Sequence, residues 1–424
     1  MSIGPGFKYF IPGEKGQILS ESPLWSRLLS GNCADFSKNG PIPGPIPGRS
    51  PGAEPTIGDY FSAARTFLEN GDCHVLEVAL SAIAGKGENH SSISSVELYL
   101  EKHGVFYHPL RVKVFTQTCS PVSLVLNGAV SGPGLALIKT EYQLLDRLGK
   151  QAASAYTPKV FAAGIQRLEI SNFEKFNPID SGSEERKVGF FLGEWFEGFQ
   201  EFHISTRDGG EPKIAVWASN GDVEYLSLER ASCIYEQIAY ILTIHYNLDT
   251  GEQIFPWHHA AGDFVVNLLA EGFSVKLITV RGYASLMEFD LKADPGGHIL
   301  PSLLFFFLNL TLRAQMDRMD GVGALVFLGE SVLNATITGF LRGLDDKSHK
   351  EATQDNSDSA LIPGGAPGLR KIFIKFMAGF SREQIEAILT NLMEAWPGNV
   401  SERTMAQAHL KSHSACIHSL FKNR

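Results

Sequence analysis

Residues 122–148 read VSLVLNGAVSGPGLALIKTEYQLLDRL and place a strand directly before a helix. The first nine residues are mostly apolar and include three valines, which predicts a strand that ends at the Gly and Pro residues that follow. In residues 135–148 apolar side chains recur at intervals of three and four, which predicts an amphipathic helix. Glu141 stands among those apolar positions. A carboxylate that faces a core needs a cation or several hydrogen-bond donors. Glu141 is therefore a candidate functional residue, unless it lies at the edge of the stripe and reaches water.

Strand-like runs flank this stretch and are followed by helical patterns. Runs rich in β-branched and aromatic residues predict strands at 96–100, 105–115, 159–163 and 188–196, and a hairpin that joins 214–218 to 223–228. After residue 228, apolar residues and one histidine fall on one helical face: Ile234, Ile238, Ile241, Leu242 and His245. Two more strands, at 264–266 and 275–280, precede long helices that reach the end of the chain. We therefore expect an α+β fold of two lobes, β-rich over 57–200 and mainly helical over 201–424.

Two segments have no apolar period and are expected to lie outside these lobes' cores. Residues 1–56 form an N-terminal arm that ends in a Pro/Gly-rich connector, GPIPGPIPGRSPGAEP at 40–55. Residues 345–368 are polar and then rich in Pro and Gly, which predicts a flexible loop between helical segments.

Composition limits the class of protein. The 424 residues include 37 Lys and Arg against 46 Asp and Glu, a net charge of −9, which argues against nucleic acid as a partner. The five cysteines include no CxxC pair, which favours reduced thiols over a disulfide or zinc framework. Residues 1–15 lack the apolar core of a secretory signal, and we expect a cytoplasmic protein.

The most apolar run, ILPSLLFFFLNLTL at 299–312, is shorter than the roughly 20 residues that a membrane span needs. We expect a buried core helix there and no membrane span. The charged run 316–321 that follows is expected to end this helix through ion pairs and a Gly cap, rather than to form a site.

A second candidate site lies in residues 254–266, IFPWHHAAGDFVV, where a loop leads into a buried strand. His258, His259 and Asp263 are its chemically active side chains, and a loop held by a rigid strand is a usual place for a site. Zinc binding is disfavoured, because adjacent histidines do not readily point the same way and no HExxH spacing is present. A structural loop with one buried histidine is the plainer alternative.

The order of these segments over residues 94–290 resembles the protein-kinase-like fold, and most closely its aminoglycoside and choline phosphotransferase branch. The resemblance implies that the third strand carries a Lys that binds the nucleotide phosphates and pairs with a Glu on the next helix. Glu141 fits the Glu position, but Asn127 stands where the Lys is expected. Lys113 or Arg281 would have to supply the missing charge. The resemblance also places the hinge between the lobes at 193–199, GEWFEGF.

The catalytic loop implied by this resemblance is altered as well. Aligning GDFVV with the end of that loop puts Asp263 at a metal-ligand position and His258 at the position of the catalytic base. Thr279 stands where the next strand should deliver a second metal-binding Asp. An Asp is an oxygen ligand of the kind that Mg²⁺ prefers, whereas a Thr hydroxyl binds it weakly.

Three functional hypotheses follow. The leading one is a kinase-like pseudoenzyme that binds a ligand or a protein partner in the cleft between the lobes and needs no cofactor. The alternative is an atypical phosphotransferase that uses ATP and Mg²⁺, with Asp263 as the metal ligand and His258 or His259 as the base. The His-His-Asp group alone supports a third hypothesis, a metal-dependent hydrolase on an unrelated fold.

Overall fold

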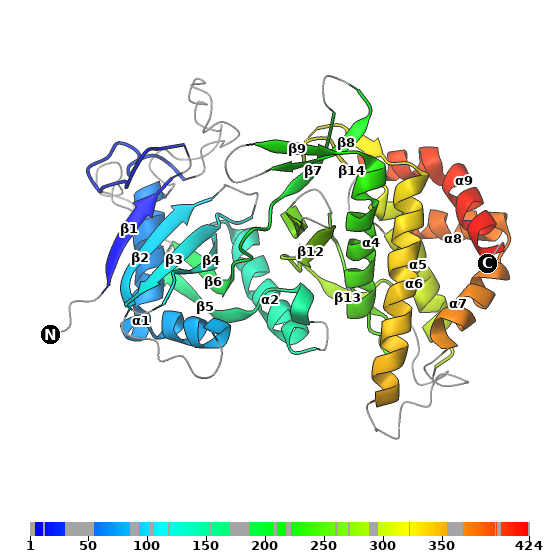
Figure 1. The fold of residues 1–424 in the computed structure, drawn as a ribbon, viewed down its shortest axis with the longest axis horizontal. Coiled ribbons are helices and arrows are strands. Elements are labelled where there is room, and N and C mark those ends of the chain that lie inside the picture. The colour runs from blue at the N-terminus through cyan, green and yellow to red at the C-terminus, as the bar shows by residue number, and fades with distance from the viewer. Residues whose placement is uncertain are drawn as a thin grey trace, which may run out of the picture. The chain divides into compact units, whose positions relative to one another are not determined.

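The computed structural model describes two compact units (Figure 1). The N-terminal unit comprises Met1–Gly149 and Pro158–Glu197, and the C-terminal unit comprises Lys150–Thr157 and Gly198–Arg424. Within these spans the described residues are 5–11, 13–29, 55–84, 93–101, 106–117, 119–151, 154–168, 186–206, 210–217, 222–258, 262–269, 272–287, 296–321, 323–353, 368–394, 396 and 400–422. The first unit ends at Glu197, inside the segment 193–199 that was expected to contain the hinge.

The N-terminal unit is built on a mixed six-stranded sheet of order β1-β2-β3-β4-β6-β5. Its strands are β1 (Gly6–Phe10), β2 (Ile93–Leu100), β3 (Leu110–Thr116), β4 (Val122–Ala129), β5 (Val160–Arg167) and β6 (Lys187–Glu194). All neighbours are antiparallel except β1, which runs parallel to β2. The predicted α+β class is confirmed, and a strand lies in each predicted range of this region, although the strand expected at 105–115 begins only at Leu110. The arm 1–56 is not separate from the sheet, since it contributes β1.

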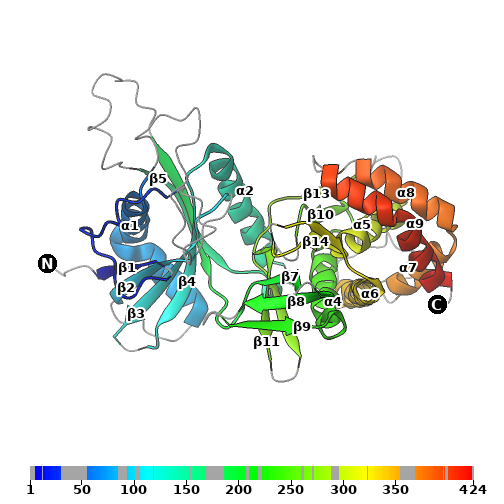
Figure 2. The same ribbon diagram turned by 90° about the horizontal axis from the view of Figure 1, so that it is seen from above.

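Two helices cover opposite faces of this sheet, as Figure 2 shows: α1 (Ile57–Ala84) and α2 (Gly132–Gly149). Successive residues of a strand point to opposite faces. Phe190 accordingly joins the core that α1 covers, and Phe191 lies near Tyr142 of α2, with ring centroids 6.4 Å apart. The helix predicted at 135–148 is therefore present, and it packs on the face of the sheet to which Phe191 points.

Helix α1 was not predicted, although its start carries a recognisable signal. The Thr56 hydroxyl accepts a hydrogen bond from the Asp59 N–H (3.1 Å), and the Asp59 carboxylate accepts one from the Thr56 N–H (2.9 Å). This reciprocal pair is a capping box with Asp in place of the usual Glu. Gly71, in the middle of the helix, has a positive φ of 63°. An Asn-Gly pair at that position reads locally as a turn, which hides the helix from a sequence pattern.

The C-terminal unit combines small sheets with long helices. A three-stranded sheet of order β7-β8-β9 and three two-stranded sheets, β10-β13, β11-β12 and β14-β15, are present among its described residues. The strands are β7 (Phe202–Thr206), β8 (Pro212–Trp217), β9 (Val223–Leu226), β10 (Glu252–Ile254), β11 (Phe264–Leu268), β12 (Phe273–Leu277), β13 (Tyr283–Ser285), β14 (Met316–Arg318) and β15 (Leu325–Phe327). The helices are α4 (Leu228–His245), α5 (Ile299–Ala314), α6 (Glu330–Thr353), α7 (Leu369–Ala378), α8 (Arg382–Glu394) and α9 (Val400–Lys422).

The core of this unit is formed around α5, whose residues are almost all buried. Phe307 packs against the rings of Phe340, Phe373 and Phe421, which come from α6, α7 and α9. The expected buried core helix is thus confirmed. None of the described helices combines the length and the apolar character that crossing a bilayer would require.

Helices α4 and α6 approach each other closely because two glycines of α6 face α4. A Cβ added at Gly339 would lie 2.0 Å from the Glu236 carbonyl oxygen, and one added at Gly343 would lie 2.7 Å from the Thr243 side chain. Only a residue without a side chain fits at such a distance. The spacing Gly-x-x-x-Gly puts both glycines on one face of α6.

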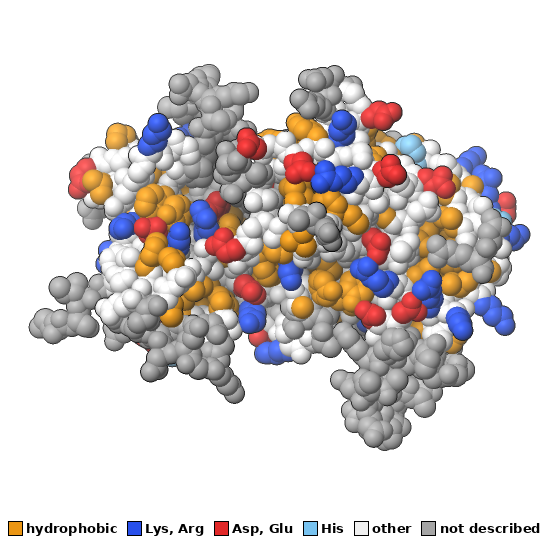
Figure 3. Space-filling model, in the orientation of Figure 1, with side chains coloured by type: hydrophobic (Ala, Val, Ile, Leu, Met, Phe, Trp, Pro, Cys, Tyr) orange, Lys and Arg blue, Asp and Glu red, His pale blue; other side chains and the backbone are white. Residues whose placement is uncertain are grey.

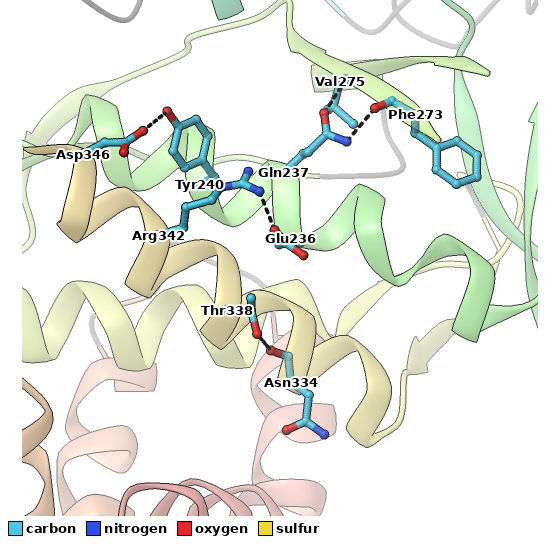
Figure 4. A network of polar contacts seen from close by, with 9 residues as sticks. All are labelled: Glu236, Gln237, Tyr240, Phe273, Val275, Asn334, Thr338, Arg342 and Asp346. Carbon is cyan, nitrogen blue, oxygen red and sulfur yellow. Dashed lines mark hydrogen bonds and ion pairs between the residues drawn. The ribbon is translucent and has the colours of Figure 1, made fainter. Parts of the chain in front are cut away.

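Polar contacts flank this close approach (Figure 4). Arg342 of α6 forms an ion pair with Glu236 and lies 4.3 Å from the centre of the Tyr240 ring. Gln237 points the other way, toward β12, where its side chain donates to the Phe273 carbonyl (2.7 Å) and accepts from the Val275 N–H (3.0 Å). Because both bonds go to strand backbone, Gln237 fixes the position of β12 against α4.

The structure corrects two sequence predictions in this unit. Helix α6 continues to Thr353, so the predicted loop 345–368 is wrong over 345–353, while 354–367 lie outside the described residues. Helix α5 ends at Ala314 with Gln315 as its cap, and residues 316–318 form β14 rather than a Gly-capped helix end. The stretch 30–54, with most of the predicted connector, also lies outside the described residues.

On the face shown in Figure 3, acidic and basic side chains are interspersed over both units. Proteins that bind nucleic acid present a basic patch or stripe instead. Among the described residues visible on this face, no such stripe is present.

Candidate functional site

The loop that follows β10 is held at both ends by one neighbouring segment, residues 278–282. At its start, the Phe255 N–H donates to the Gly282 carbonyl (3.1 Å), and at its end the Ile278 N–H donates to the Asp263 carbonyl (2.8 Å). A Cβ at Gly282 would lie 2.4 Å from the Phe255 carbonyl oxygen, so this approach requires glycine. The pairing of β11 with β12 and of β10 with β13 produces this arrangement. The loop is therefore anchored by backbone contacts at both of its ends.

Asp263 is the most deeply buried charged residue of this loop, with 1% of its surface exposed. Its Oδ2 accepts a hydrogen bond from the Arg281 guanidinium (2.6 Å) and another from the backbone N–H of His258 (2.8 Å). Burial raises the pKa of the Asp263 carboxyl above its ordinary value, and the adjacent Arg281 opposes that change. The carboxylate thus joins the end of the loop to the segment 278–282 through a charged pair.

The structure brings four of the predicted site residues together. Thr279 is half-buried and follows Ile278, whose N–H binds the Asp263 carbonyl. The backbone N–H of His258 and the guanidinium of Arg281 both donate to the Asp263 carboxylate. The predicted neighbourhood of Asp263 and Thr279 is therefore present, whereas His259 lies outside the described residues.

The N-terminal unit holds the other three predicted residues. Glu141 is 1% exposed, as its place on the apolar stripe suggested. Asn127 pairs with Phe191 across β4 and β6, and since paired residues point to the same face, it lies on the side that α2 covers. Lys113 pairs with Ser123, four residues before Asn127, which corresponds to about 13 Å along the strand. Lys113 is therefore too far along the sheet to replace the Lys expected at Asn127.

A cavity of about 260 Å³ opens beside His258 in the C-terminal unit. It is lined by His258, Arg313, Met316, Asp317, Arg318, Gly321, Leu325 and Glu402. Arg313 and Asp317 are 7% and 4% exposed, although both carry charge. Neither is among the predicted site residues. The sequence carries one signal for Arg313, because this residue directly follows fourteen mostly apolar residues. A charged residue at the end of a buried helix is itself buried, and a buried charge needs a partner.

The Mg²⁺ that the resemblance implies does not fit the residues around Asp263. One carboxylate oxygen is already bound by a guanidinium, whose positive charge would repel a metal ion at the same place. Thr279 adds only a hydroxyl, while Mg²⁺ is usually held by carboxylates together with phosphates. Within the described part of the chain, no three His, Cys, Asp or Glu side chains are arranged to hold a metal.

No protein-family model matches the sequence, and no curated protein matches it.

Proposed function

We propose that the protein is a kinase-like pseudoenzyme, which binds a ligand and transfers no phosphoryl group. Two features support the kinase-like plan. Helix α2, with the buried Glu141, follows the third antiparallel strand of the sheet, as the resemblance implies. The loop with His258 and Asp263 leads directly into β11, and the partner strand β12 is followed by Thr279.

The ion pair of Arg281 with Asp263 carries the proposal that transfer is lost. Phosphoryl transfer relies on cations that neutralise the phosphates and on carboxylates that hold the metal. Arg281 is a cation that could have replaced the missing Lys, and Asp263 is the carboxylate expected to bind Mg²⁺. Each neutralises the other at 2.6 Å, so neither charge is directed at a nucleotide.

One observation favours the alternative, an atypical phosphotransferase. Asp263 Oδ1 is buried and accepts no hydrogen bond from the described residues, so one oxygen of the carboxylate keeps its capacity to bind a cation. In that case Asp263 is the metal ligand and His258 or His259 the base. The donor set is still smaller than Mg²⁺ usually requires, which is why we prefer the pseudoenzyme.

Nucleotide binding and turnover separate the two proposals. We expect no thermal stabilisation by ATP, with or without Mg²⁺ or Mn²⁺, and no autophosphorylation or transfer to small hydroxylated acceptors. The variant Asn127→Lys/His258→Asp/Thr279→Asp should recover nucleotide binding if the alignment is right. ATP turnover by the wild-type protein that Asp263→Ala abolishes, and that the control Asp345→Ala leaves intact, would establish the alternative instead.

A further inference from the structure

The two outer strands of the six-stranded sheet differ in how their free edges are protected. Strand β1 lies at one edge and contains Lys8, and its outer side is partly covered, because the Ile18 N–H donates to the Tyr9 carbonyl (2.8 Å). Strand β5 lies at the other edge, and among the described residues only β6 pairs with it. An uncovered edge offers N–H and C=O groups to another strand, so proteins usually shorten it, cover it or place Lys or Pro on it.

Strand β5 has little of this protection. Its eight residues, VFAAGIQR, include no proline and only one charge, Arg167 at the end. Its pairing with β6 is irregular at the start, between Val160 and Ala162, and regular beyond that point. Ala163, Ile165 and Arg167 are exposed, and Ile165, at 62%, is the most exposed large apolar side chain described in the N-terminal unit. A long apolar edge strand of this kind is a site for pairing with another chain.

The space beside this edge is open on the side of α1. Helices α1 and α2 lie on the two faces of this end of the sheet (Figure 2). Between β5 and α1 there is an open hollow of about 480 Å³, lined by Gln166 and by Thr66, Glu69, Asn70 and Gly71. A strand added to β5 would therefore meet a hollow on this face of the sheet rather than a packed helix.

We propose that two copies of this chain pair antiparallel through β5, with Ile165 of each copy opposite Ile165 of the other. This register buries the two exposed isoleucines against each other. It places Gln166, which lines the hollow, opposite Gly164 of the other copy, where no side chain competes for the space. It also places Arg167 opposite Ala163, so no charge meets a like charge.

The strand is complementary to itself, which is why a second copy fits it. The two Arg167 side chains of the pair are four residues apart along the strands, or about 14 Å, which is beyond the screening length of about 8 Å at physiological salt. The apolar Ile165 finds an equal apolar partner, as cross-strand pairs require. The pairing uses only the N-terminal unit, and it goes beyond the proposed function without depending on it. ATP turnover would not affect this inference.

The first experiment measures the mass of the full-length protein by sedimentation velocity over a range of concentrations. A strand pair is smaller than most stable interfaces, so we expect a reversible dimer that grows with concentration. Ile165→Lys should remain monomeric where the wild type is dimeric, because two lysines would stand opposite each other. Leu19→Lys is the control, since Leu19 is 57% exposed and follows Ile18 at the other edge of the sheet. It should dimerise as the wild type does.

Two results would overturn the proposal. A wild-type protein that is monomeric at every concentration would leave this edge to a different partner or to none. An Ile165→Lys variant that dimerises as the wild type does would place the interface elsewhere. Circular dichroism of the variant verifies that the exposed substitution leaves the fold intact.

Cysteine variants then test the register. In Ile165→Cys the two Cβ atoms should lie about 4.5–5.5 Å apart, close enough for a disulfide to form on mild oxidation. In Ala163→Cys the two cysteines should be about 14 Å apart along the strands and remain unlinked. The wild type measures the background from the five native cysteines. Equal yields of linked dimer from both variants, or no linked dimer from Ile165→Cys, would contradict the proposed pairing.

Discussion

Arg281 donates a 2.6 Å hydrogen bond to the buried carboxylate of Asp263, and this contact joins the end of the 255–263 loop to the segment that follows β12. Eighteen residues separate the two in the sequence. The pair holds the end of the loop in place. It also neutralises the cation and the carboxylate that a phosphotransferase would have used to bind phosphate and Mg²⁺.

Removing one partner of this pair should destabilise the protein. In Arg281→Met, Asp263 stays buried without its cation, and we expect a loss of about 3 kcal/mol in the free energy of unfolding. That figure is at the lower end for buried pairs, because Arg281 is 24% exposed. Urea denaturation of the variant and the wild type measures the loss. Arg370→Met is the matched control, since its partner Asp345 is exposed and such surface pairs contribute about 0–1 kcal/mol. Equal losses in both variants would mean that Asp263 is not a buried charge.

The close packing of α4 on α6 should not tolerate side chains at the two glycines of α6. Gly339→Ala would place a Cβ within 2.0 Å of the Glu236 carbonyl oxygen, so one helix must shift. Overpacking of this kind costs about 1–3 kcal/mol, and we expect a lower melting temperature. Gly329→Ala is the control, because a Cβ there meets nothing within 4 Å. A melting temperature equal to that of the wild type in Gly339→Ala would contradict the observed helix distance.

His413 should make the stability depend on pH. It is buried in α9, where its ring contacts Gln315 (2.7 Å) and Thr311 (3.3 Å), and burial lowers its pKa from 6.5 to about 3. Above pH 6.5 the ring is neutral in both the folded and the unfolded chain, so it adds no pH dependence. Below pH 6.5 the unfolded chain binds the proton first, and stability falls by up to about 1.4 kcal/mol per pH unit until the folded pKa is reached.

The His413 contribution is measured as a difference between proteins, because carboxylates also titrate at low pH. His413→Gln should lose less stability than the wild type between pH 6.5 and 4.5 in parallel denaturation curves. His409→Gln is the control, since His409 is half-buried and stacks on Phe327 at 4.0 Å. If His413→Gln and the wild type show the same slope, His413 is not held neutral by the fold.

Gln237 should be needed to hold β12 against α4. Gln237→Ala removes a donor to the Phe273 carbonyl and an acceptor for the Val275 N–H, and leaving such groups unsatisfied costs about 1–3 kcal/mol. Gln237→Glu keeps the acceptor and loses the donor, so we expect an intermediate loss. Amide hydrogen exchange at Val275 reports the effect directly: exchange should be faster in the Ala variant and protected in the Glu variant. Unchanged exchange in Gln237→Ala would show that strand pairing alone protects this amide.

The periodicity of apolar residues was sufficient to predict the strands and helices that depend mainly on residues close to them in the sequence. The strand and helix at 122–148, the hairpin of β8 and β9, the buried stripe of α4 and the buried helix α5 all follow from periodicity. The burial of Glu141 was predictable as well, because this residue lies on the apolar stripe of its helix and that stripe faces the core. The same applies to Asp263 and Thr279, which two adjacent antiparallel strands bring together.

Tertiary structure alone decided which charges meet. The sequence offers Arg281 only as one of two residues, with Lys113, that would have to supply the missing phosphate-binding charge, and the fold of the loop directs it to Asp263 instead. The cavity joins His258, Asp317 and Glu402, which are separated by dozens of residues and come from a loop, a strand and a helix. A periodic pattern records which face of an element is buried, but not which other element covers that face. The amino-acid sequence thus determined the elements and their buried faces, whereas the partners of the buried charges depended on how those elements pack.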